Sequence, residues 1–183
     1  MKLKTLIVAF AVAAVLPVAA LADPAAPSDK ANGARACQAL KTSLGEATFK
    51  VTYGTNANKS NAMGQCVSKG TRGEHQNRHE ASTACTAEQA DANFAATHGG
   101  KTFAQFYGVG KKDANAMQRC VQSKRQAAST EDRQATANAA QKCKAERTTL
   151  GETAFKAKYG TNESKSNAFG KCVSKLAQAQ QSS

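Results

Sequence analysis

Cysteine is the residue type in this sequence whose chemistry is easiest to assign. The chain has 183 residues and six cysteines. An even number of cysteines in an exported chain predicts disulfide bonds, because oxidising compartments let thiols pair. The spacing contains no Cys-x-x-Cys, so it indicates neither a thioredoxin-like redox centre nor a zinc knuckle. The cysteines are Cys37, Cys66, Cys85, Cys120, Cys143 and Cys172.

The pairing of these cysteines is constrained by what lies between them. Six cysteines allow about 15 pairings, and spacing alone does not choose among them. The apolar residues cluster between the first and second, third and fourth, and fifth and sixth cysteines, whereas residues 68–84 contain no large apolar side chain. Pairing across the polar segments would force Cys37 to meet Cys172 from the far end. The sequence therefore favours the pairs Cys37–Cys66, Cys85–Cys120 and Cys143–Cys172.

His75 and His79 are the candidates for a metal site. They are four residues apart, so they share a face if this segment is helical, and two imidazoles at that spacing can bind zinc, copper or nickel. Glu74 or Glu80 could assist. The order Glu-His-x3-His-Glu differs from the His-Glu-x-x-His of zinc proteases. The plainer interpretation is a solvated polar helix, and we assign no metal or cofactor to the chain.

No set of residues in the sequence has the pattern of an enzyme active site. Covalent catalysis needs a nucleophile, a base and a group that orients the base. Serines are numerous, but none stands in Gly-x-Ser-x-Gly, and the cysteines are assigned to disulfides. We therefore assign no catalytic residue and expect a protein that is not an enzyme. A hydrolase with an unfamiliar site is the enzymatic alternative.

The cysteine pairs enclose a sequence that occurs three times. Residues 37–69 and 143–175 are identical at 21 of 33 positions, and residues 85–120 are a more divergent copy. All three share the frame Gly-x3-Phe-x3-Tyr-Gly-x6-Asn-Ala-(Met/Phe)-x2-Cys-Val. The phrases Tyr-Gly-Thr-Asn and Ser-Asn-Ala-Phe-Gly-Lys-Cys-Val-Ser resemble repeats of uncharacterised secreted bacterial proteins. The resemblance implies export and repetition, and it carries no activity to this chain.

The repeated frame has the period of an α-helix. Its Phe and Tyr are four residues apart, and Met63, Cys66 and Val67 stand at i, i+3 and i+4, so each set shares one helix face. We expect about three short helices in each unit: one with the first cysteine, one with Phe and Tyr, and one with the second cysteine. Glycines should end helices in left-handed conformations, and asparagines should cap the next helices. The expected C-terminal caps are Gly45, Gly54, Gly99, Gly108, Gly151 and Gly160, and the expected N-caps are Asn61, Asn115 and Asn167.

The predicted fold class is all-α, with three tandem disulfide-stapled helical units joined by polar, partly helical linkers. The first linker contains Gly70 and Gly73, where we expect a bend, whereas the second contains no Gly or Pro and can continue one helix from about Asn115 to Leu150. The predicted organisation is a signal peptide (1–22), a disordered N-terminus (23–33), a first unit (34–69), a linker (70–81), a second unit (82–124), a linker (125–139), a third unit (140–176) and a disordered tail (177–183).

Residues 1–22 have the pattern of a signal peptide. Lys2 and Lys4 precede an apolar run, and Ala20-Leu21-Ala22 has the small-x-small form of a cleavage site. A permanent membrane anchor is the alternative, and it is disfavoured because the run is short and contains Pro17. We expect a secreted or extracytoplasmic protein of the periplasm or cell envelope, with no transmembrane span after cleavage.

The remainder of the chain is basic and poor in large apolar residues. The formal net charge is +12, and it is +10 once Lys2 and Lys4 are removed. Residues 23–183 contain 15 Leu, Val and Phe in total and neither Ile nor Trp. Such a chain buries little apolar surface, so we expect its disulfides to supply much of its stability.

The positive charge indicates the kind of partner to expect. A cationic surface attracts anionic polymers and lipids, and it binds nucleic acid without sequence preference. We expect a non-enzymatic binding or structural protein of the cell envelope or extracellular space. Its expected partners are anionic envelope polymers, acidic lipid headgroups or another protein, with nucleic acid bound only non-specifically. The alternative is a secreted metal-binding protein that uses His75 and His79.

Overall fold

The computed structural model describes residues 24–110 and 113–181, and the predicted signal peptide lies outside these ranges. The described ranges form eight α-helices and no strand, which confirms the all-α prediction. The helices are α1 (Pro27–Leu44), α2 (Glu46–Tyr53), α3 (Ala62–Ala90), α4 (Phe94–Thr97), α5 (Phe103–Tyr107), α6 (Ala116–Leu150), α7 (Glu152–Tyr159) and α8 (Ala168–Gln181).

Two long helices connect the three units. Helix α6 runs without interruption through residues 125–139, as the lack of Gly and Pro predicted, and its 35 residues span roughly 50 Å. Helix α3 likewise runs through residues 70–81, so the bend predicted at Gly70 and Gly73 is wrong. The last helix of one unit is therefore also the first helix of the next.

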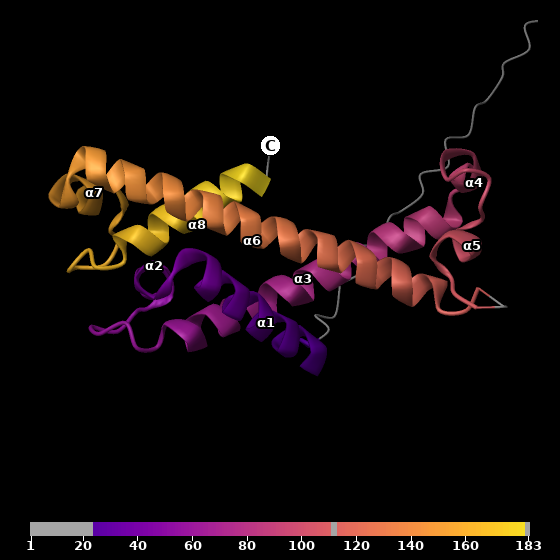
Figure 1. Cartoon of the computed structure of the whole chain (residues 1–183), viewed down its shortest axis with the longest axis horizontal. Coiled ribbons are helices and arrows are strands. Elements are labelled where there is room, and N and C mark those ends of the chain that lie inside the picture. The colour runs from indigo at the N-terminus through magenta and orange to yellow at the C-terminus, as the bar shows by residue number, and fades with distance from the viewer. Residues whose placement is uncertain (1–23, 111–112, 182–183) are drawn as a thin grey trace, which may run out of the picture.

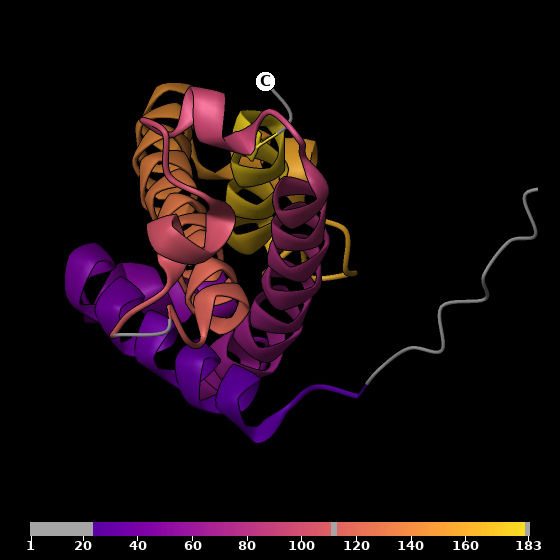
Figure 2. The ribbon, with the colours of Figure 1, turned by 90° about the vertical axis from the view of Figure 1, so that its right-hand side faces the viewer.

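These helices form an elongated antiparallel arrangement. Helix α1 packs on α3, α3 packs on α6, and α6 packs on α8, while the short helices lie at the two ends (Figure 1). Helices α2 and α7, from the first and third units, share one end of the molecule, and α4 and α5 of the second unit occupy the other end. In the view turned by 90°, α1 runs obliquely beneath α3, α6 and α8 (Figure 2).

Gly70 serves close packing of two helices and not flexibility. A Cβ atom at Gly33 of α1 would lie 2.7 Å from the backbone nitrogen of Thr71 and 2.8 Å from the carbonyl carbon of Gly70. The two helix backbones can approach this closely only because both residues lack a side chain. Gly70, at which the sequence predicted a bend, instead allows the close contact between α1 and α3.

Each disulfide lies inside one small hydrophobic cluster. All six cysteines are 2% exposed or less, and a buried phenylalanine of the repeat packs in each cluster (Phe49, Phe103 and Phe155). The bonds are within the units, as predicted: Cys37–Cys66, Cys85–Cys120 and Cys143–Cys172. Each bond joins the helix before the Phe–Tyr helix to the helix after it, and so closes the unit on its own core.

The first and third units are in contact with each other. Leu44 and Val51 of the first unit pack against the hydrophobic cluster of the third. A Cβ atom at Gly170 of α8 would lie 2.5 Å from the backbone oxygen of Thr52 in α2. The Lys59 ammonium group donates to the backbone oxygen of Ser166 at 3.4 Å. The first and third units therefore pack together at one end of the molecule, which we call the composite end, and they are not independent of each other.

Both ends of the described chain are helical where the sequence suggested disorder. Helix α1 begins at Pro27, and the carboxylate of Asp29 accepts a hydrogen bond from the backbone N–H of Ala26 at 2.8 Å. Helix α8 continues to Gln181, whose side-chain amide donates to Asp132 at 2.6 Å. The disorder prediction is wrong for residues 27–33 and 177–181, because contacts with distant helices hold both segments.

The glycines of the frame have two different roles. Gly45 and Gly151 have φ of +77° and end α1 and α6, which agrees with the prediction. The glycines after the tyrosines are instead extended, so their predicted left-handed conformation is wrong. A Cβ at Gly54 would lie 2.6 Å from the Cβ of Lys59, so the loop closes only over a glycine. The extended glycines are Gly54, Gly108 and Gly160, with φ of −69°, −69° and −71°.

The asparagines of the frame close loops and do not cap helices. The Asn61 carbonyl accepts from the backbone N–H of Thr55 at 3.0 Å, and its amide donates to the Thr55 hydroxyl at 2.7 Å. Asn167 makes the same two bonds to Thr161, at 3.0 and 2.8 Å. Asn61 and Asn115 precede α3 and α6 without a side-chain capping bond.

The contact between the first and third units can be tested with two glycines from the same repeat position. Gly64→Ala places a methyl group in open space within a helix and should stabilise the protein by about 0.5–1 kcal/mol. Gly170→Ala places it against Thr52 and should lower the free energy of unfolding by about 1–3 kcal/mol. Denaturant unfolding measures both, and equal effects at the two positions would contradict the contact.

The stability of the second unit should depend on its disulfide more than the stability of the first and third units, which pack on each other. Closure of a 35-residue loop contributes about 4 kcal/mol in the chain-entropy model. The double variant Cys85→Ser/Cys120→Ser should open residues 91–110 while the composite end stays folded, because units one and three brace each other. Amide hydrogen exchange should show fast exchange confined to that end. Exchange that accelerates uniformly along the chain would contradict this picture.

Candidate functional site

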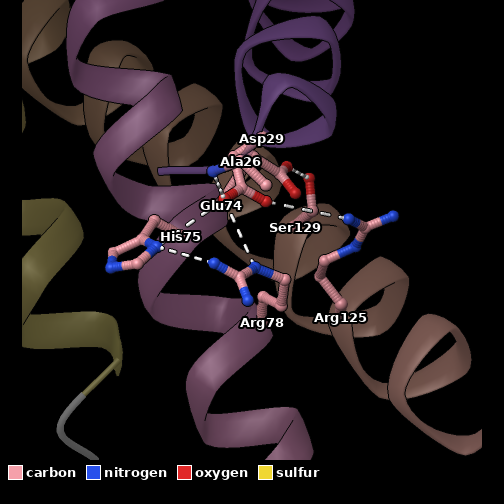
Figure 3. Close-up of polar contacts among 7 residues, drawn as sticks. All are labelled: Ala26, Asp29, Glu74, His75, Arg78, Arg125 and Ser129. Carbon is pink, nitrogen blue, oxygen red and sulfur yellow. Dashed lines mark hydrogen bonds and ion pairs between the residues drawn. The ribbon is translucent and has the colours of Figure 1, made fainter. Parts of the chain in front are cut away.

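A buried aspartate joins three helices near the middle of the molecule. The Asp29 side chain has no exposed surface, and its Oδ2 atom accepts from the Arg78 Nε of α3 at 3.3 Å as well as from the Ala26 N–H. The Arg125 Nη1 of α6 lies 4.0 Å from its Oδ1 atom. Figure 3 shows these groups converging on Asp29. The start of α1 is thus fixed to α3 and α6 by charge.

His75 belongs to this network. Its Nδ1 atom lies 3.6 Å from Asp29 Oδ2 and 3.1 Å from Arg78 Nη2. His79 shares its helix face, as the i, i+4 spacing predicted, with the two ring centroids 4.7 Å apart. No group of three or more His, Cys, Asp or Glu side chains within residues 24–110 and 113–181 is arranged to hold a metal. The structure does not favour a metal site at these histidines.

Further polar contacts connect α3 to α6 and α8. Glu74 is 5% exposed and accepts a hydrogen bond from the Ser129 hydroxyl at 2.5 Å. The Asn77 amide donates to Asp132 Oδ2 at 2.9 Å, and Asp132 Oδ1 accepts from Gln181. Buried polar groups of this kind stabilise an interface only when each has a partner. This part of the bundle is therefore held by directed bonds and little apolar surface.

A polar cleft of about 840 Å³ runs between these helices. Asp132 and Glu74 are among its lining residues, and both carboxylates already accept hydrogen bonds from other side chains of the protein. Tyr53 also lines it, and burial raises the pKa of the Tyr53 hydroxyl to about 12. Much of the hydrogen-bonding capacity of the cleft is thus used within the protein.

A second, smaller pocket of about 350 Å³ lies between α1 and α6, and three of its lining residues are arginines. We call it the arginine pocket. Its only acidic lining residue is Glu74, which also lines the larger cleft. The lining residues are Asn32, Arg35, Ala36, Glu74, Arg125, Gln126, Ser129, Thr130 and Arg133.

A group of three cations spans α3 and α8, and we call it the basic cluster: Lys69, Arg72 and Lys171. All three side chains are exposed, and within the described part of the chain none forms an ion pair with a carboxylate. Partial desolvation, followed by the nearby charges of Lys171 and Arg72, lowers the pKa of the Lys69 ammonium group. The first and third units therefore bring like charges together at their common end.

Sequence reasoning found the disulfides and the helical spacing of the histidines, but it missed the charged sites. Pro27 followed by Asp29 is a helix-start signal that was available, since Pro favours the first helical position and acidic residues favour the first turn. The arginine pocket and the basic cluster join residues far apart in the sequence. Only the packing of α1 on α6 and of the first unit on the third brings their members together.

Comparison with protein families, curated proteins and solved structures gave no match. The structure itself defines the class of the protein, an all-α protein closed by intramolecular disulfides. No helix within the described ranges is long and apolar enough to cross a membrane.

The contribution of the Asp29 network to stability can be measured by removing the Asp29 carboxylate. Asp29→Ala leaves two partly buried arginines without their carboxylate and should lower the free energy of unfolding by about 2–4 kcal/mol. The control Glu46→Ala removes an exposed carboxylate paired with Lys41 and Lys50 and should change stability little. Denaturant unfolding of both variants provides the comparison. Similar small losses in the two would show that Asp29 does not anchor α1.

Proposed function

We propose that this protein is an exported, non-enzymatic binding protein of the cell envelope or extracellular space that holds anionic polymers on its basic surface. Three disulfides are typical of proteins that fold in an oxidising compartment. A net charge of +12 favours association with polyanions. Both features support the proposal but do not locate the binding surface.

The observation that carries the proposal is the basic cluster of Lys69, Arg72 and Lys171. Like charges placed together repel one another and reduce stability, so an uncompensated group of them is costly unless an anion binds there. Some other surface cations are neutralised by a carboxylate. Lys41 and Lys50 pair with Glu46, at 2.8 and 3.2 Å.

The shape of the cluster fits a polymer better than a small ligand. Its side chains are exposed and come from two helices, α3 and α8, with Lys171 and Arg72 close enough to Lys69 to lower its pKa. They form a charged surface that an extended chain can follow. Lys59 and Lys165 lie in the loops at the same end of the molecule and do not pair with a carboxylate among the described residues. An anionic glycopolymer with regularly spaced phosphate or sulfate groups can contact several of these cations at once.

Binding to heparin and to poly(glycerol phosphate) tests this function. The logarithm of the association constant should fall linearly with the logarithm of salt concentration, and loss of three cations should reduce the slope by up to about 3. The variant Lys69→Gln/Arg72→Gln/Lys171→Gln should bind weakly and with the reduced slope. The matched variant Lys101→Gln/Lys142→Gln/Lys144→Gln loses the same charge from other exposed positions and should bind nearly as the parent does.

The two triple variants also separate a defined site from diffuse attraction. Equal losses in both would assign the binding to net charge alone and would refute the basic cluster. Binding that is absent, or that does not depend on salt, would refute the polyanion function itself. Vesicles of phosphatidylglycerol in the same assay report whether acidic headgroups compete with the polymers.

A further inference from the structure

The arginine pocket has properties that the basic cluster lacks, because it is concave and two of its three arginines, Arg125 and Arg133, are partly buried. It lies beside the Asp29 network, where Ser129 of α6 projects toward Glu74 of α3 and Arg125 of α6 projects toward Asp29 (Figure 3). We propose that this pocket binds a tetrahedral oxyanion, the phosphate or sulfate group of a small ligand such as a sugar phosphate. This inference is independent of the proposed polymer binding, since the two sites share no residue.

The charge of the pocket favours an anion. Three arginines and one carboxylate, that of Glu74, line the pocket, and the Ser129 hydroxyl donates to this carboxylate. The buried Asp29 carboxylate lies outside the lining, 4.0 Å from Arg125. The lining therefore carries an excess of positive charge in a partly enclosed space, where electrostatic attraction is stronger than at an open surface.

The arginines retain donors for a ligand. Arg35 makes no ion pair with a carboxylate of the described residues. The Arg125 side chain is 16% exposed, and its nearest ion-pair partner, Asp29 Oδ1, lies 4.0 Å away, beyond hydrogen-bond distance. A guanidinium group that has lost most of its water but lacks close acceptors gains when an oxyanion supplies them.

Arg133 is held in place without being neutralised. Its Nε donates to the backbone oxygen of Ser129 at 3.2 Å, and its Nη2 donates to the Thr130 hydroxyl at 3.1 Å. Both acceptors are uncharged, so the side chain is oriented while its positive charge remains available. Preorganisation of this kind reduces the entropy that a ligand must overcome on binding.

The chemistry of the lining selects the ligand class. The planar guanidinium fork donates two parallel hydrogen bonds to phosphate or sulfate oxygens, which an ammonium group cannot do. Asn32 and Gln126 also line the pocket and offer neutral donors and acceptors suited to hydroxyl groups. A volume of about 350 Å³ lies at the lower end of the range for small-molecule sites, roughly 300–1,000 Å³. A phosphate or sulfate monoester of a sugar matches this charge, hydrogen-bonding capacity and volume.

Isothermal titration of the intact protein tests the inference. The probes are inorganic phosphate, sulfate, glucose 6-phosphate, unesterified glucose and acetate. Glucose 6-phosphate should bind most tightly, phosphate and sulfate more weakly, and glucose and acetate not measurably. Failure of glucose 6-phosphate, phosphate and sulfate alike to bind would overturn the proposal, as would equal binding of acetate and phosphate.

Variants assign the binding to the pocket. Arg35→Gln/Arg133→Gln should weaken glucose 6-phosphate binding on the order of tenfold or more, because each lost charge-assisted bond is among the stronger polar contacts. Neither residue contacts Asp29, so circular dichroism should show an intact fold. Arg35→Lys/Arg133→Lys keeps the charge but loses the fork and should bind with intermediate affinity. The control Lys142→Gln/Lys144→Gln removes two charges from the same helix and should bind as the parent does.

The triple variant of the basic cluster distinguishes this site from the polymer surface. Lys69→Gln/Arg72→Gln/Lys171→Gln should retain glucose 6-phosphate binding, and Arg35→Gln/Arg133→Gln should retain most of the affinity for poly(glycerol phosphate). If glucose 6-phosphate binding is lost in the first variant and kept in the second, the arginine pocket is not the oxyanion site. Chemical shift changes confined to α1 and α6 in NMR spectra would support the assignment.

Discussion

The fold depends on covalent closure of hydrophobic clusters that are too small to hold the chain alone. In the second unit the buried cluster consists of Phe94 and Phe103 around the Cys85–Cys120 bond. Burial of two phenylalanines stabilises by roughly 3–6 kcal/mol, whereas ordering each residue of the enclosed segment costs about 1–2 kcal/mol. The disulfide reduces that cost by restricting the unfolded chain. The shared helices α3 and α6 add the rest, because each extends the order of one unit into the next.

Much of this architecture could be predicted from local pattern, and the errors have a common cause. The helical period of the repeated frame indicates the all-α class, and the apolar residues between successive pairs of cysteines indicate the pairing within units. Both patterns depend on residues close in sequence. Gly70 was misjudged because a glycine permits both a bend and a close helix contact. Its partner Gly33 lies on another helix, and only tertiary packing shows which role applies. The predicted disorder at the start of α1 and the end of α8 was wrong for the same reason, because distant side chains hold both segments.

The charged sites could not be derived from the sequence, because their residues are far apart in the chain and meet only through tertiary packing. Arg35 and Arg133 are 98 residues apart, and Lys69 and Lys171 are 102 apart, with nothing in their neighbours to connect them. Net charge predicted an anionic partner but not a place for it to bind. For His75 the local pattern was correct, since it shares a helix face with His79. The residues around it nevertheless give it a structural role and not the role of a metal ligand. It lies against Asp29 and Arg78 as part of the structural network.

The repeat also shows how nearly identical segments acquire different roles once they pack together. Gly64 and Gly170 occupy the same repeat position, yet one faces open space and the other faces the Thr52 backbone. The contact at Gly170 holds the first unit against the third, and Lys69 comes from one unit and Lys171 from the other. The repulsion between these cations opposes the packing that brings them together. An anion bound across them would relieve the repulsion, so polymer binding and cohesion of the composite end should reinforce each other.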